Sequence, residues 1–121
     1  MLRVDDYVRQ AQLNADLIPA LPLERFDWQI TACFYTSLHW LNAVTRRMGK
    51  PEARNHTQTF QNIREARLPP AIRDAYEDLY HSSILARYEC ALLETLEPDA
   101  LEAKALLEEI SVYAKKLLGL N

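Results

Sequence analysis

The chain is organised by apolar residues that recur at the spacing of an α-helix. Between Asp27 and Met48, apolar side chains return every three to four positions without interruption, and Gly49 and Pro51 then end the pattern. Only two glycines and six prolines occur in 121 residues, so turns are few. No segment alternates polar and apolar residues as a half-buried strand would. These features predict a long central helix over 27–48 in an all-α protein.

Four further helices are predicted from the same periodicity. Their ranges are Arg3–Leu17, Asn55–Ala66, Pro69–Leu93 and Asp99–Gly119. Asp27, Asn55 and Asp99 are each expected to cap a helix N-terminus, because a short polar side chain there accepts a backbone N–H. Gln58 and Glu102 stand three residues after two of these caps and are expected to reach back to them. We therefore expect an antiparallel four- to five-helix bundle.

Composition limits the class of protein. Residues 1–121 are expected to form a single domain, with 49% hydrophobic and 26% charged residues. The acidic, polar N-terminus is unlike a signal peptide, and no apolar run approaches the roughly 18 residues of a membrane span. We therefore expect a cytoplasmic protein that does not enter the membrane.

Metal and nucleotide-hydrolysis motifs are missing from the sequence. Cys33 and Cys90 have no second cysteine nearby, and the acids of the last helix have no histidine at metal-binding spacing. With Gly49 and Gly119 as the two glycines, no phosphate-cradling glycine loop exists. The sequence therefore predicts neither a metal site nor a bound cofactor.

Two predicted helices carry a stripe of polar and aromatic side chains on one face. The stripes are Tyr35, His39, Asn42 and Arg46, then Tyr76, Tyr80, Ser83 and Arg87. Burying such groups costs several kcal/mol unless they are paired. The stripes therefore predict a binding site or a polar network in the bundle interior, where we expect His39 near Tyr80 or Arg87.

Charge is segregated along the chain. From Arg46 to Arg73 there are seven basic and two acidic residues, a net charge of +5, whereas the whole chain carries −3 and the remainder therefore −8. This asymmetry predicts an anionic partner for the basic span, with Arg46, Arg47 and Arg54 among the binding residues. The alternative is a solvated surface without a partner.

Two histidines are candidates for chemistry. His39 lies in the middle of a helix, where a neutral imidazole can act as a general base on a ribose hydroxyl, or can be a hydrogen-bonded core residue. His56 follows Arg54 and Asn55 at a helix start, where free N–H groups and the helix dipole favour an anion. The alternative is a capping turn with incidental bases. His81 is expected to point to solvent.

Arg87 is the third candidate. Its guanidinium can hold a phosphate or carboxylate with two hydrogen bonds, and the rings of Tyr35, Tyr80 and Tyr88 can stack on a base. The alternative is a structural salt bridge between helices. Its expected partner is Asp27 or Glu77.

The order of these features resembles the HEPN superfamily of small α-helical bundles. The similarity rests on the segment from Asp27 to His39, the Gly49-Lys50-Pro51 loop, His56 at a helix start, and the segment from Tyr80 to Tyr88. It covers about half the chain. Active members of that superfamily are metal-independent ribonucleases that dimerise, so that two motifs in which four to six residues separate Arg from His face one another.

This sequence lacks that motif. Seven residues separate Arg73 from His81, and one separates Arg54 from His56. The resemblance therefore implies a homodimeric, non-catalytic module that binds nucleotide, RNA or a partner protein in a toxin-antitoxin or defence system. One alternative is a metal-independent ribonuclease with His39 or His56 as base and Arg87 as the cation. Another is a purely structural helical partner.

Overall fold

The computed structural model describes residues 1–88 and 92–120, and within them it is helical without strands. The α-helices are α1 (Val4–Leu17), α2 (Phe26–Arg47), α3 (His56–Glu65), α4 (Pro70–Tyr88) and α5 (Glu97–Leu118). Two short 3₁₀ helices, η1 (Ile18–Ala20) and η2 (Leu93–Leu96), precede α2 and α5. The expected all-α bundle of four to five helices is confirmed.

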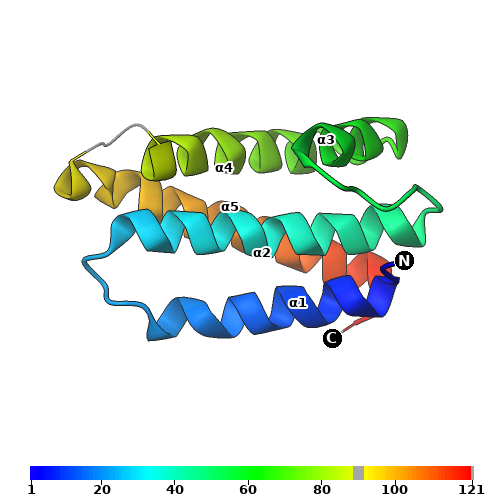
Figure 1. Cartoon of the computed structure of the whole chain (residues 1–121), viewed down its shortest axis with the longest axis horizontal. Helices are drawn as coiled ribbons and strands as arrows, with labels where there is room; N and C mark the ends of the chain where they lie inside the picture. The colour runs from blue at the N-terminus through cyan, green and yellow to red at the C-terminus, as the bar shows by residue number, and fades with distance from the viewer. Residues whose placement is uncertain (89–91, 121) are drawn as a thin grey trace.

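The long helices form an up-and-down bundle. α1, α2 and α4 lie side by side with alternating direction, α5 lies behind them, and the two termini are at the same end (Figure 1). The short α3 lies in front of α4, beside the first half of that helix (Figure 1). This position brings the start of α3 close to the middle of α4.

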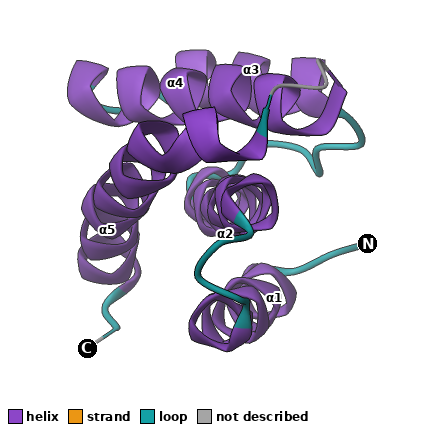
Figure 2. Cartoon of the chain, turned by 90° about the vertical axis from the view of Figure 1, so that its left-hand side faces the viewer, coloured by secondary structure: helices purple, strands orange, loops and turns teal. Residues whose placement is uncertain are grey.

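α2 is the centre of the molecule, as its uninterrupted apolar pattern predicts. Figure 2 shows it end-on, with α1, α4 and α5 arranged around it. Ile30, Phe34, Trp40 and Leu41 are fully buried along α2. A helix that is apolar on most sides must be surrounded, because each exposed face would leave apolar surface in water.

The polar residues inside α2 are mostly satisfied by the helix itself. The hydroxyls of Thr31 and Thr36 donate to carbonyls one turn earlier, at 2.8 and 2.7 Å. Asn42 instead accepts a 3.3 Å hydrogen bond from the Thr59 hydroxyl of α3. These bonds pair the hydroxyls of Thr31, Thr36 and Thr59, whereas the buried Ser37 hydroxyl of α2 has no partner among the described residues.

Several predicted helix ends are confirmed. Gly49 and Gly119 have φ of 87° and 74°, left-handed values that suit glycine after a helix. The Asn55 side chain accepts the Gln58 N–H at 2.8 Å and caps α3. The Gln58 side chain does not reach back to Asn55 as expected, because it bonds Asn62 one turn ahead.

Two predicted caps are wrong. Asp27 lies inside the first turn of α2, and its carboxylate pairs with Arg25 at 2.9 Å instead of capping the helix. Asp99 also lies inside a helix, because α5 begins at Glu97 with Pro98 in its first turn. Proline fits there because its missing N–H would have no helical partner.

The fourth helix is shorter than the sequence predicts. We expected it to reach Leu93, but α4 ends at Tyr88, Leu92 is not helical, and Leu93 begins η2. Cys90, which we expected to close this helix, lies outside the described residues. Cys33 is a free, buried cysteine in α2, and burial raises the pKa of its thiol to about 11.

Candidate functional site

Arg87, in the last turn of α4, is held by neutral groups. Its Nη1 donates to the Tyr35 hydroxyl of α2 at 2.8 Å. Its Nε donates to the Ser83 carbonyl at 3.2 Å, and its Nη2 to the Ser83 hydroxyl at 3.1 Å. Among the described residues, Arg87 forms no ion pair. Its hydrogen bonds therefore fix the guanidinium in place without neutralising its charge.

Aromatic rings surround the same guanidinium. Its central carbon lies 5.6 Å from the ring centroid of Phe34, 5.4 Å from that of Tyr35 and 4.9 Å from that of Tyr88. These distances are within the range of cation–π attraction. Tyr88 is 66% exposed, so the outer wall of this cage borders solvent. Arg87 itself is only partly buried.

His56 lies at the start of α3 and faces the same cluster. Its ring centroid is 5.5 Å from the rings of both Phe34 and Tyr80. Burial, with a further contribution from the positive charge of Arg87, lowers the pKa of His56. Its Nδ1 is buried and has no hydrogen-bond partner among the described residues. His56 is therefore a neutral imidazole at pH 7.

These groups make a site suited to an anion. Arg87 supplies a fixed positive charge, and the first N–H groups of α3 supply the positive end of a helix dipole. His56 can gain a proton when a negative charge arrives. The hydroxyls of Tyr35 and Tyr88 add donors at its edge.

The structure gathers five of the residues that the sequence singled out. They are Tyr35, His56, Tyr80, Arg87 and Tyr88. The sequence analysis treated His56 and Arg87 as separate candidates, and packing of α3 on α4 brings them to one cluster. The expected salt bridge of Arg87 is wrong, because Asp27 pairs with Arg25 and Glu77 faces the exposed His81 at 3.8 Å.

His39 lies elsewhere. It lines two surface depressions together with residues of α1. The histidine beside Tyr80 and Arg87 is instead His56. Burial lowers the pKa of His39, and its Nδ1 has no partner among the described residues. The expectation that His39 meets Tyr80 or Arg87 is therefore wrong.

The basic residues of the span from Arg46 to Arg73 are not one site either. Arg46 donates to the carbonyls of Leu2 and Lys50 at 3.3 and 3.0 Å, which ties the N-terminal segment to the end of α2. Arg47 is exposed in the last turn of α2. Of the three predicted basic binding residues, Arg54 is nearest the cluster in sequence, two residues before His56.

Two residues of the cluster were not predicted as site residues. Phe34 contacts both His56 and Arg87, but its position on the apolar side of α2 indicated only a core residue. Ser83 was noted only as a stripe member. Its spacing four residues before Arg87 is the signal that could have identified it, since such pairs meet on one helix face.

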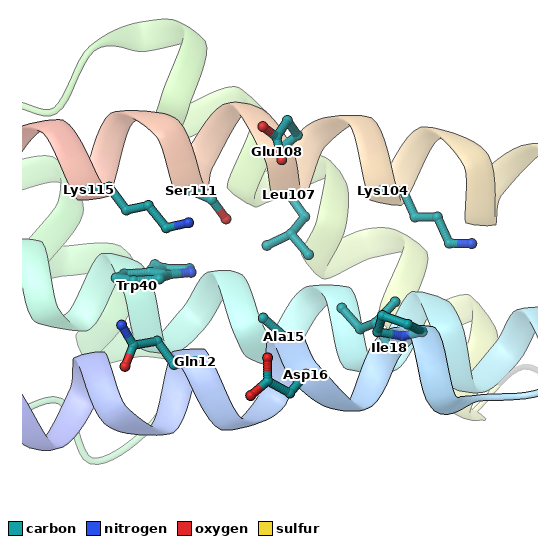
Figure 3. Close-up of a pocket in the computed structure, with 11 residues that line it drawn as sticks. Gln12, Ala15, Asp16, Ile18, Trp40, Lys104, Leu107, Glu108, Ser111 and Lys115 are labelled. Carbon is teal, nitrogen blue, oxygen red and sulfur yellow. The ribbon is translucent and has the colours of Figure 1, made fainter. Parts of the chain in front are cut away.

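Hollows on the surface of the bundle lie outside this cluster. A cleft of about 380 Å³ between α1 and α5 has Trp40 at its floor, and Lys115 of α5 lies over that ring at 5.8 Å (Figure 3). Trp40 is only 1% exposed, so its ring offers no open surface to a ligand. A groove of about 340 Å³ between α1 and α2 is lined in part by Trp28, Tyr35 and His39.

No protein-family model, curated protein or solved structure matches the chain. The HEPN resemblance therefore stays a prediction. Among residues 1–88 and 92–120, no group of three or more histidine, cysteine or acidic side chains could hold a metal ion. Within the same residues, no helix is both long enough and apolar enough to cross a membrane.

Proposed function

We propose that the chain is a HEPN-like helical module that binds nucleotide or RNA through a phosphate at Arg87 and His56. The observation that carries this proposal is the half-buried guanidinium of Arg87, which is fixed by hydroxyl and carbonyl groups but has no counter-ion among the described residues. A buried charge costs several kcal/mol when it lacks a partner. An incoming phosphate would supply that partner.

The hydrogen bonds of Arg87 leave room for such a ligand. A guanidinium has five N–H donors, and four of them point to Tyr35, Ser83 and Tyr88. One Nη2 donor has no partner among the described residues. The bond to the exposed Tyr88 is long, at 3.4 Å, so a phosphate oxygen could replace it at little cost.

A second candidate function is metal-independent cleavage of RNA. The specific observation in its favour is the neutral imidazole of His56 beside a fixed cation. Such a base can accept the proton of a ribose 2′-hydroxyl while Arg87 stabilises the negative charge that develops on the phosphoryl oxygens. Cleavage of single-stranded RNA in the presence of a chelator, lost in His56→Gln, would support this function.

We also propose that the chain forms a homodimer. We further propose a role in a toxin-antitoxin or defence system, which rests on the resemblance alone. Large aromatic residues on the central helix would support a dimer only if they were exposed. Phe34 and Trp40 are buried within the chain, so they do not contribute to an interface. A purely structural role for the polar cluster is the remaining alternative.

The test of the main proposal is binding of a labelled single-stranded RNA at increasing salt. Affinity should fall linearly with salt on logarithmic axes, because phosphate binding releases counter-ions. Arg87→Met should weaken binding at least about tenfold. The control Arg64→Met removes an exposed cation at the far end of α3 and should change affinity about twofold or less.

The possible results separate the alternatives. Wild-type protein that binds neither RNA nor a mononucleotide at low salt would contradict phosphate recognition. If Arg87→Met lowers the melting temperature but leaves RNA affinity unchanged, the cluster is structural. Equal losses in Arg87→Met and Arg64→Met would indicate a diffuse basic surface instead of a site.

A further inference from the structure

Tyr35 belongs to two features of the surface. Its hydroxyl accepts the hydrogen bond from Arg87 at 2.8 Å, and its side chain also lines the groove between α1 and α2. The proposed phosphate site and this groove are therefore next to each other and share a wall. A ligand held by Arg87 can extend past the Tyr35 ring into the groove.

The groove is mainly apolar. Leu17 and Leu21 line it from α1 and the segment that follows, and Trp28 lines it from α2. Trp28 is 54% exposed, although a large aromatic side chain usually gains by burial. The volume of about 340 Å³ is at the lower end of the range for small-ligand pockets. A flat, mostly apolar group of modest size fits these properties.

Two polar side chains in the groove have hydrogen-bonding capacity to spare. The Asn14 oxygen accepts from Gln10 at 2.8 Å, and its amide donors have no partner within the described residues. The buried Nδ1 of His39 also lacks a partner there. The groove thus combines apolar walls with an amide and an imidazole. A nucleobase has the matching chemistry, a flat apolar face with donors and acceptors along its edge.

We propose that the groove between α1 and α2 binds the nucleobase of the ligand whose phosphate Arg87 and His56 hold. This inference rests on the proposed phosphate site. The ligand class is then a nucleoside phosphate, free or as one unit of single-stranded RNA, because a base inside a duplex is stacked and cannot enter a groove. Trp28 and Tyr35 supply the aromatic surface against which the base packs.

Trp28 also supplies the readout. The chain contains two tryptophans, and Trp40 is almost fully buried, so a ligand in the groove should change the fluorescence of Trp28 selectively. The probes are adenosine 5′-monophosphate, ribose 5-phosphate and inorganic phosphate. Calorimetry should give adenosine monophosphate about five- to one-hundred-fold higher affinity than ribose 5-phosphate, the range that base stacking on aromatic residues spans. Of the three, only the nucleotide should quench Trp28.

Trp28→Leu should remove the higher affinity for adenosine monophosphate over ribose 5-phosphate. It should leave the affinity for ribose 5-phosphate unchanged. Asn14→Leu should reduce the advantage in part, without altering the Arg87 site. The matched control is Leu23→Ala, which truncates an exposed apolar residue between η1 and α2, outside the groove, and should keep the wild-type difference. Melting temperatures within about 3 °C of wild type would exclude unfolding as the cause, since surface substitutions cost little.

Three results would overturn the inference. Equal affinities for adenosine monophosphate and ribose 5-phosphate, with Trp28 unaffected, would remove the base from the groove but leave the phosphate site standing. No binding of any of the three probes would remove both proposals. A change in Trp28 fluorescence with protein concentration alone would identify a second copy of the chain as the occupant of the groove.

Discussion

His56 controls how the site responds to pH. Burial and the charge of Arg87 lower its pKa in the folded chain, so the unfolded chain binds more protons once the pH falls below about 6.5. Burial also lowers the pKa of His39, so His39 changes stability with pH in the same direction. The free energy of unfolding should therefore decrease as the pH falls from neutral to about 5. The lowered pKa of Asp27, which pairs with Arg25, acts only at still lower pH.

Urea unfolding at several pH values tests this first prediction. The His39→Gln, His56→Gln double variant should lose less stability between neutral pH and about pH 5 than wild type does, because glutamine does not titrate. His81→Gln is the control, since His81 is exposed and faces Glu77. If the stability of the double variant depends on pH as that of wild type does, His39 and His56 are not the groups that cause the loss of stability.

Ligand binding should depend on pH in the opposite direction. A bound anion favours protonated His56, so affinity should rise as the pH falls below about 6.5. The probe should be a dinucleotide with a single phosphodiester, because a phosphomonoester itself titrates near pH 6. His56→Gln should bind more weakly and with affinity independent of pH. An affinity of the wild-type chain that does not vary from about pH 5 to 7.5 would mean that His56 does not face the anion.

At the scale of the helix, Asn55 connects a cap to the site. Its side chain holds the first turn of α3, and His56 is the first residue of that helix. Asn55→Ala should cost about 1 kcal/mol of stability and also weaken phosphate binding, because the N–H groups of the first turn lose their fixed direction. Asn55→Asp keeps an acceptor and should restore stability, measured by thermal unfolding. Unchanged binding in Asn55→Ala would show that α3 does not help to hold the anion.

The helices themselves were predictable because each has an apolar side that repeats with helical period. Their exact starts were less so. The caps at Asn55 and Asp27 were predicted on the same ground. Asn55 does accept the Gln58 N–H, whereas Asp27 has Arg25 two residues away and pairs with that side chain instead. A proline in the first turn moved the start of α5 upstream of Asp99. Where a helix begins therefore depends on which nearby groups a polar side chain can bond. Residue propensities alone do not predict that choice.

The site was predictable only in parts, because its parts meet through packing between helices. The α2 stripe shares one face, yet its members contact different neighbours. Tyr35 bonds α4, His39 lies with α1, and Asn42 bonds α3. The stripe lies where α2 contacts several neighbouring helices. The spacing of residues along α2 does not predict which of those helices each side chain will contact. Arg87 and Tyr35 are 52 residues apart, beyond the reach of any local pattern.

At the scale of the whole molecule, the basic residues between Arg46 and Arg73 should contribute unequally to RNA binding. Arg54 precedes the cap of α3, whereas Arg47 is at the end of α2 and away from the cluster. Arg54→Glu should therefore weaken RNA binding several-fold and reduce the salt slope by about 1, the value expected for one phosphate contact. Arg47→Glu should have the smaller effect. The reverse order in salt titrations would locate the anion at the end of α2 instead.

The proposed homodimer can form without covering the groove, because α5 does not line the groove and exposes two apolar side chains. Leu101 and Val112 are 64% and 57% exposed, and their separation of eleven residues puts them on one face of that helix. In an antiparallel pair of α5 helices related by a two-fold axis, Leu101 of each copy would face Val112 of the other. The same register sets Glu97 opposite Lys116, and neither forms an ion pair within the described chain. This face is therefore complementary to itself.

A charge swap tests that arrangement by sedimentation. Lys116→Glu should shift the protein towards monomer, because it sets two carboxylates opposite each other across the interface. Glu97→Lys combined with Lys116→Glu should restore the dimer, since both pairs then have opposite charge again. Trp28→Leu should leave the mass unchanged. A wild-type chain that is monomeric at tens of micromolar would contradict the dimer, and a double variant that stays monomeric would contradict this register of α5.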